Sequence, residues 1–96
     1  MYMSKDISKY SNQAIVQQQA NKYLSKDVKV MLSTRKDKNY MVRNPEGKWI
    51  HFGQYGYEDY TKHKDEIRRE NFKRRNAKWS KADKYSPSWL SYWLLW

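Results

Sequence analysis

Aromatic side chains are the feature that most limits what this chain can fold into. Its 96 residues include 5 Trp, 9 Tyr and 2 Phe but no Cys, so neither disulfides nor thiolate metal sites can stabilise a fold. A chain of this length has room for one compact unit with a modest core. Each aromatic side chain covers roughly 150–250 Å² when it is buried. We therefore expect a folded unit whose interior depends on aromatic residues.

The overall polarity of the chain is high. A mean hydropathy of -1.21 and a 31% share of charged residues are also found in disordered chains, but those chains contain few aromatic residues. This one is therefore predicted to fold, alone or together with a partner. The first twenty residues lack the apolar stretch of a signal peptide, and no apolar run reaches the length of a membrane span. We expect a protein that is neither secreted nor inserted in a membrane.

The N-terminal part of the chain predicts one short amphipathic helix. Apolar residues recur at three- and four-residue steps after Ser11 and Asn12, and these two polar residues are typical helix caps. The same pattern predicts that Gln17 to Gln19 face mostly outward. We interpret residues 1–27 as a helical arm set off from a compact basic α+β domain at residues 28–96.

The next part of the chain predicts a β-hairpin. Residues 28–32 alternate apolar and polar side chains in part, as a half-buried strand does. The sequence NPEG at residues 44–47 is typical of a type I turn, with Pro at the second position and Gly at the fourth. Residues 40–43 and 48–52 should therefore pair as antiparallel strands.

The second half of the chain predicts two further helical segments. Residues 67–78 are rich in helix formers, and acidic residues precede basic ones, the order that the helix dipole favours. Ser86 followed by Pro87 predicts a new helix start before the nearly all-apolar residues 88–96. The predicted fold class is α+β: a small antiparallel sheet or hairpin with an N-terminal helix, a basic helix and an aromatic C-terminal helical segment.

Several short motifs in this half resemble one protein family. The chain has HFG at residues 51–53, GYEDYTKHKD at residues 56–65 and LLW at residues 94–96. On these motifs it resembles a family of small, basic, uncharacterised proteins of nucleocytoplasmic large DNA viruses, and the likeness covers a little over half of the chain, from Tyr40 onward. The resemblance implies a viral protein located in the virion or in the host cytoplasm or nucleus, associated with DNA or with the virus particle. It implies no particular activity.

The strongest charge signal lies between Lys62 and Lys81, where nine basic residues stand against three acidic ones, while the whole chain has a formal net charge of +10. Cations interleaved with aromatic residues suit phosphate contacts and base stacking, so nucleic acid, DNA rather than RNA, is the expected partner. The alternative is a solvated helix face on which Glu66 and Glu70 pair with Lys73 and Arg74. The residues predicted to contact nucleic acid are Lys62, Lys64, Arg68, Arg69, Lys73, Arg74, Arg75, Lys78 and Trp79.

No motif predicts catalysis, a metal or a cofactor. The chain has two histidines, His51 and His63, but no Cys and no HExxH spacing that would support a metal site. Tyr57, Asp59 and His63 could form a proton-transfer cluster, yet no nucleophile paired with a base and no phosphate-binding loop accompanies them. We predict a non-enzymatic protein without catalytic residues, metal or cofactor.

Trp89, Trp93 and Trp96 form one stripe of the C-terminal segment because they are spaced four and three residues apart. One interpretation is core packing. The other is an anchor into a capsid or other virion protein, since Trp dominates many interfaces. A membrane-surface helix is disfavoured because the segment lacks cations. The predicted function is nucleic-acid binding with little sequence specificity, and the alternative is a minor structural virion protein that docks through this stripe and the N-terminal helix.

Overall fold

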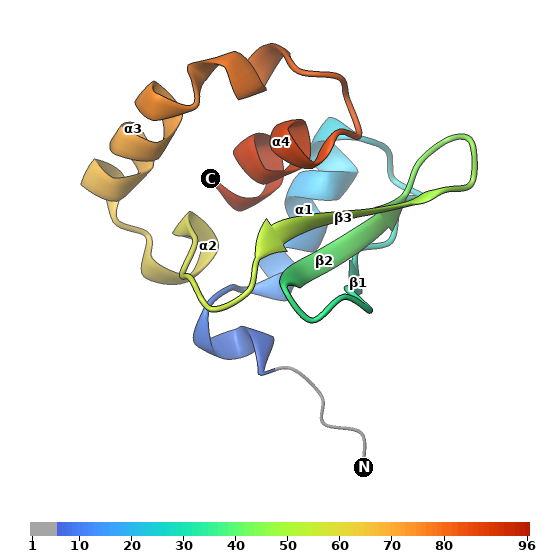
Figure 1. The fold of residues 1–96 in the computed structure, drawn as a ribbon, viewed down its shortest axis with the longest axis horizontal. Coiled ribbons are helices and arrows are strands. Elements are labelled where there is room, and N and C mark those ends of the chain that lie inside the picture. The colour runs from blue at the N-terminus through green and yellow to red at the C-terminus, as the bar shows by residue number, and fades with distance from the viewer. Residues whose placement is uncertain (1–5) are drawn as a thin grey trace.

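A three-stranded antiparallel sheet in the order β1-β2-β3 lies in the middle of the chain, with helices before and after it (Figure 1). The structure is a computed structural model and describes residues 6–96. This arrangement confirms the predicted α+β class and the aromatic C-terminal helical segment. The elements in chain order are the 3-10 turn η1 (Ile7–Lys9), α1 (Gln13–Tyr23), β1 (Met31–Leu32), β2 (Lys38–Arg43), β3 (Trp49–Gln54), α2 (Tyr60–His63), α3 (Glu66–Arg75), the 3-10 turn η2 (Ala77–Lys81), α4 (Pro87–Leu90) and the π-helical turn η3 (Ser91–Leu95).

The hairpin of β2 and β3 forms as the sequence predicts. Gly47 donates its N–H to the carbonyl oxygen of Asn44 at 2.9 Å. Its φ of 87° is a left-handed conformation that glycine adopts without a steric penalty. The turn fixes a register in which Tyr40 lies opposite Phe52, and both side chains are fully buried.

β1 is shorter than the strand predicted at residues 28–32, because within that segment only the last two residues pair with β2. The cause is Gln17 of α1. Its side-chain amide donates to the carbonyl oxygen of Val28 at 2.8 Å, and its side-chain oxygen accepts from the N–H of Val30 at 2.8 Å. These backbone groups are therefore satisfied without a sheet partner. Gln17 faces this segment and not solvent, contrary to the prediction.

α1, which lies in the arm predicted at residues 1–27, contributes residues to the core. Asn12 caps the helix as predicted, by accepting two backbone N–H groups of the first turn. Val16 and Ala20 are fully buried, and α1 packs against η3. Small side chains on this face let the helix approach its neighbours closely, so it helps to close the interior. Residues 1–5 of the predicted arm lie outside the described residues.

Residues from both halves of the chain fill the core. Two of its members, Tyr40 and Phe52, are aromatic, and the other eight are aliphatic, so the interior depends less on aromatic burial than the composition predicts. No helix of the described part, the apolar C-terminal segment included, is long and apolar enough to cross a membrane. The buried hydrophobic residues are Ile7, Val16, Ala20, Val30, Tyr40, Val42, Phe52, Leu90, Leu94 and Leu95.

α3 lies on the outside of the molecule (Figure 1), and none of its residues is buried. Asp65 caps it by accepting two backbone N–H groups of the first turn. The α-helix ends at Arg75, three residues before the predicted end, because Asn76 leaves the helical conformation with φ of -114° and ψ of 32°. Its side-chain amide donates to the carbonyl oxygen of Phe72 at 2.9 Å. Lys78 therefore lies in η2.

Candidate nucleic-acid interface

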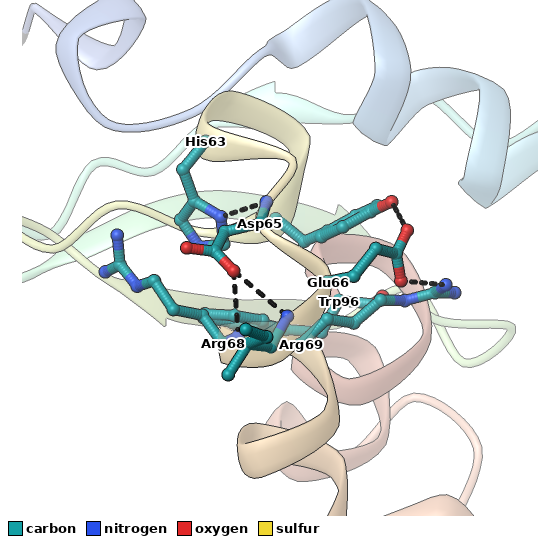
Figure 2. A network of polar contacts seen from close by, with 8 residues as sticks. His63, Asp65, Glu66, Arg68, Arg69 and Trp96 are labelled. Carbon is teal, nitrogen blue, oxygen red and sulfur yellow. Dashed lines mark hydrogen bonds and ion pairs between the residues drawn. The ribbon is translucent and has the colours of Figure 1, made fainter.

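A network of polar contacts fixes the direction in which α3 leaves the molecule (Figure 2). The backbone N–H of Asp65 donates to Nδ1 of His63 at 2.9 Å, while the Asp65 carboxylate caps α3. Glu66 accepts a hydrogen bond from the hydroxyl of Tyr60 and forms an ion pair with Arg69 at 3.7 Å. α3 is thus attached to α2 at its first turn, so the cations along it project from a defined position.

His63 is a structural residue of this network. Because its Nδ1 accepts a hydrogen bond, the proton of the neutral ring lies on Nε2, which is buried without a partner. Burial and the nearby Arg68 guanidinium lower the pKa of His63 below its ordinary value of 6.5. Its ring packs against Trp96 with centroids 5.1 Å apart. His63 is therefore neutral at pH 7 and adds no charge to the surface.

Arg69 and Lys73, two of the predicted phosphate contacts, hold α3 against the C-terminal segment. Nε of Arg69 donates to the backbone oxygen of Trp96 at 2.7 Å, and its guanidinium lies 4.7 Å from the ring centroid of Tyr60. Nζ of Lys73 lies 4.8 Å from the ring centroid of Tyr92. Burial, and after it Arg69, lower the pKa of Lys73. Both cations are occupied by contacts within the molecule, which the sequence pattern did not reveal.

The other predicted cations are exposed. None of them forms an ion pair with an acidic residue within residues 6–96. The pairing of Glu66 and Glu70 with Lys73 and Arg74, which the solvated-face alternative requires, is absent from the same residues. No carboxylate of the described residues therefore lies within ion-pair distance of these cations. We call these six residues the exposed basic set: Lys62, Lys64, Arg68, Arg74, Arg75 and Lys78.

Trp79 lies at the edge of an aromatic cluster. The rings of Phe72 and Trp96 are stacked, with centroids 4.3 Å apart and an interplanar angle of 6°. Trp79 meets Phe72 edge to face at 5.8 Å. Its side chain is half-buried, so one part of the indole is held in the cluster while another part stays accessible for stacking.

Two members of the exposed basic set share one shallow recess. Arg68 and Arg75 line a depression of about 280 Å³ together with Phe72, Trp96 and Tyr57. Tyr57 is 66% exposed and is a contact candidate that the sequence pattern does not reveal. It precedes α2 in a loop, and only the folded chain brings it beside α3. Its high exposure would suit stacking on a base.

The predicted stripe of Trp89, Trp93 and Trp96 is partly buried against the core. The indole N–H of Trp93 donates to the carbonyl oxygen of Ser80 at 3.3 Å, and its ring lies 5.1 Å from that of Tyr23. Core packing accounts for one side of each indole. All three indoles keep some exposed surface, which leaves room for a partner.

The geometry adds no support for a metal site or for proton transfer. Residues 6–96 contain no group of three or more His, Cys, Asp or Glu side chains placed to hold a metal ion. His51 and His63 each use Nδ1 for a bond to a nearby hydroxyl or backbone group. In this part of the chain the side chains of Tyr57, Asp59 and His63 form no hydrogen bond with one another; Asp59 and His63 are joined only through the backbone, N–H of His63 to the carbonyl oxygen of Asp59 at 3.1 Å. The chemistry of this surface is that of charge and aromatic rings.

Comparison with known protein families finds a match over the middle of the chain. A family of unknown function, DUF5754, matches residues 28–76, which span the sheet, α2 and α3. No curated protein and no solved structure is significantly similar to the chain. The matched segment contains five of the six residues of the exposed basic set but neither α1 nor the C-terminal segment.

Proposed function

The chain belongs to the DUF5754 family of unknown function, and from the surface of this member we propose that it binds nucleic acid without enzymatic activity and with little sequence specificity. The observation that carries the proposal is the exposed basic set, whose six cations have no acidic partner within the described residues. Cations in this state release condensed counterions when they meet phosphates, and this release supplies most of the free energy of non-specific binding.

The kinds of side chain in the set also support this partner. Arg68, Arg74 and Arg75 carry planar guanidinium groups, which form forked hydrogen bonds to phosphate oxygens. Figure 2 shows no contact from the Arg68 guanidinium to the network around it. The formal net charge of +10 adds long-range attraction to any polyanion. DNA is the proposed partner, and RNA is an outcome to be compared with it.

The source and role follow from the family resemblance described above. The motifs HFG, GYEDYTKHKD and LLW support the finer proposal that this is a protein of a large DNA virus, acting in genome packaging or in the virion. It would then work in the host cytoplasm or nucleus and in the particle. A protein that packages a viral genome has to bind DNA of any sequence, so binding with little sequence specificity would suit this role.

A structural role in the virus particle is the second candidate. The accessible sides of Trp89, Trp93 and Trp96 favour it, since partly exposed indoles often anchor protein interfaces. It can no longer use α1, whose apolar face is buried in the core. Removing residues 89–96 would not test it, because three core leucines would be lost. Replacing Trp89 by Gln removes indole surface and keeps the three core leucines. Loss of association with the virus particle, together with unchanged DNA affinity, would favour the structural role.

Salt-dependent DNA binding tests the main proposal. We expect a labelled duplex of about 20 base pairs to bind in a fluorescence-anisotropy titration, with the logarithm of the affinity falling by about 0.9 per phosphate neutralised for each unit of log salt concentration. The triple change Arg68→Gln, Arg74→Gln and Arg75→Gln should reduce the magnitude of that slope by up to about 2.7.

A matched variant controls for net charge. Lys26, Lys29 and Lys48 are also exposed, and the β2–β3 turn near Lys48 lies on the opposite side of the molecule from α3 (Figure 1). Changing these three residues to Gln removes the same charge and should leave most of the slope in place. A flat salt response of the unchanged protein, or an equal loss in both triple variants, would refute the proposal.

A further inference from the structure

A cleft of about 360 Å³ opens beside the aromatic cluster. It is lined by residues from the ends of β2 and β3, from the loop before α2, from α3 and η2, and from the C-terminal segment. This volume is near the lower limit for small-molecule sites, which are usually about 300–1,000 Å³. It suits a single ring system better than a peptide segment.

Two polar residues of the cleft lining are almost completely buried. Asn39 is 1% exposed and Asp59 is 3% exposed. Oδ1 of Asn39 and Oδ2 of Asp59 have no hydrogen-bond partner among residues 6–96, whereas Oδ1 of Asp59 accepts from the N–H and O–H of Thr61 at 3.0 and 2.5 Å. A buried acceptor without a donor costs about 1–3 kcal/mol. Both unpartnered atoms are acceptors with almost no accessible surface, so N–H donors of a ligand would satisfy them once the side chains of the lining shift to admit it.

The aromatic lining of the cleft suits a flat ligand. Trp79, Trp96 and Phe72 all contribute to it, and they are the residues whose ring contacts form the aromatic cluster. Stacking of a base on such a side chain contributes about 1–3 kcal/mol. A planar ring with exocyclic amino groups would use the aromatic lining and the acceptors together.

The recess with Arg68 and Arg75 adjoins this cleft, because Tyr57, Phe72 and Trp96 line both. An anionic group attached to the planar ring would reach the two guanidinium groups. Glu58 also lines both depressions; its carboxylate disfavours a phosphate in the cleft, whereas in the recess the two guanidinium groups outnumber it. A cationic side chain of a partner would have to pass the two arginines to enter the cleft. A neutral ring inside the cleft, with a phosphate outside it in the recess, therefore fits this charge distribution better.

We propose that the cleft holds one unpaired nucleobase of a single-stranded segment, with its amino group on Asn39 and Asp59 and the adjacent phosphates on Arg68 and Arg75. The inference rests on the proposed nucleic-acid binding and adds a preference to it. Cytosine, adenine and guanine carry exocyclic amino donors, whereas thymine presents a carbonyl group instead. Bases with an amino group should therefore bind better.

The closest comparison is between oligo(dC) and oligo(dT), because the two pyrimidines have the same ring size; they differ in the exocyclic group at C4, in the proton that thymine carries on N3 and in the C5 methyl of thymine. Using strands of about 12 nucleotides at neutral pH, within the range that single-strand sites cover, we expect oligo(dC) to bind at least about five-fold more tightly. That ratio is the lower end of the discrimination given by one well-placed base contact. Quenching of indole fluorescence should accompany binding.

Asp59→Asn distinguishes base recognition from general stacking differences between the two strands. Oδ1 of the new side chain can keep the bonds to Thr61, so an amide donor replaces the unpartnered acceptor. The preference for oligo(dC) should fall to parity or reverse towards oligo(dT). Asp83→Asn changes an exposed carboxylate and should keep the preference. If Asp59→Asn does not fold, Trp79→Leu, which should weaken oligo(dC) binding, is compared with Trp49→Leu on β3, which should not.

The outcomes separate this inference from the proposed function. Equal affinity for the two strands with the salt dependence intact would overturn the base-holding cleft and leave nucleic-acid binding in place. Absence of binding to every oligonucleotide would overturn both. Indole quenching by an arginine-rich peptide but not by dCMP would show a site for cations and would also overturn the inference.

Discussion

Replacing Asp59 by asparagine should remove a large pH-dependent loss of stability. Asp59 caps α2 through one carboxylate oxygen while the other has no partner. Burial raises the pKa of Asp59 from its ordinary value of 3.8 to about 6, and hydrogen bonds from Thr61 and Ser11 oppose that rise. Within residues 6–96 no cation forms an ion pair with it, so the ionised form is left without charge compensation.

The size of the stability change follows from the rise in the pKa of Asp59. A rise of about two units corresponds to roughly 3 kcal/mol of preference for the protonated form in the folded state. Between the two pKa values the folded chain keeps a proton that the unfolded chain has released, so stability falls as the pH increases from about 4 to 6 and stays reduced above that. Asparagine has no such titration and still caps a helix well.

Urea denaturation followed by indole fluorescence measures this difference. We expect the free energy of unfolding of Asp59→Asn, minus that of the unchanged protein, to increase by about 3 kcal/mol between roughly pH 3.5 and pH 7. Any fixed cost of the new amide cancels in that comparison. Asp83→Asn, at an exposed position, should show no comparable trend. Parallel stability curves for Asp59→Asn and the unchanged protein would refute the reasoning.

Two further pairs of variants test the packing by the same denaturation assay. Gly53→Ala should lower the free energy of unfolding by about 2–4 kcal/mol, because the φ of Gly53 is 80° and the new Cβ would lie 3.1 Å from Cβ of Asn39. Gly47 has a φ of 87° but open space around it, so Gly47→Ala should cost only about 1–2 kcal/mol for the backbone conformation. Equal costs of the two variants would contradict the crowding at Gly53. Lys73→Ala should lower stability by about 1 kcal/mol, because the variant loses the contacts of Lys73 with the aromatic rings. Lys78 is exposed, so Lys78→Ala should change stability by less than about 0.5 kcal/mol. Unchanged stability of Lys73→Ala would show that the ring contacts do not hold α3.

Features that depend on neighbouring residues could be predicted from the sequence. Asn12, Asp65 and Ser86 all accept hydrogen bonds at helix starts, because a cap needs only a short polar side chain and the next few N–H groups. The turn at residues 44–47 follows the same logic. These local signals were sufficient for the α+β class and for the position of the basic helix.

Features that depend on distant residues could not be predicted. Gln17 shortens β1 from another element, and Arg69 and Lys73 are drawn into contacts with the C-terminal segment. A charge pattern cannot tell which cations will be occupied, because that depends on what packs beside the helix. The cleft with Asn39 and Asp59 brings together six parts of the chain, so no spacing of residues in the sequence predicts it.

The wide separation of the core residues along the chain affects how the protein can be made. Tyr40 and Phe52 leave the ribosome well before Leu90 and Leu95, and at about 5–20 residues per second the delay is roughly a few seconds. During that time the apolar face of the nascent hairpin has no cover, next to a strongly basic segment. The apolar surface that the final leucines cover in the folded protein therefore stays exposed on the nascent chain until they emerge.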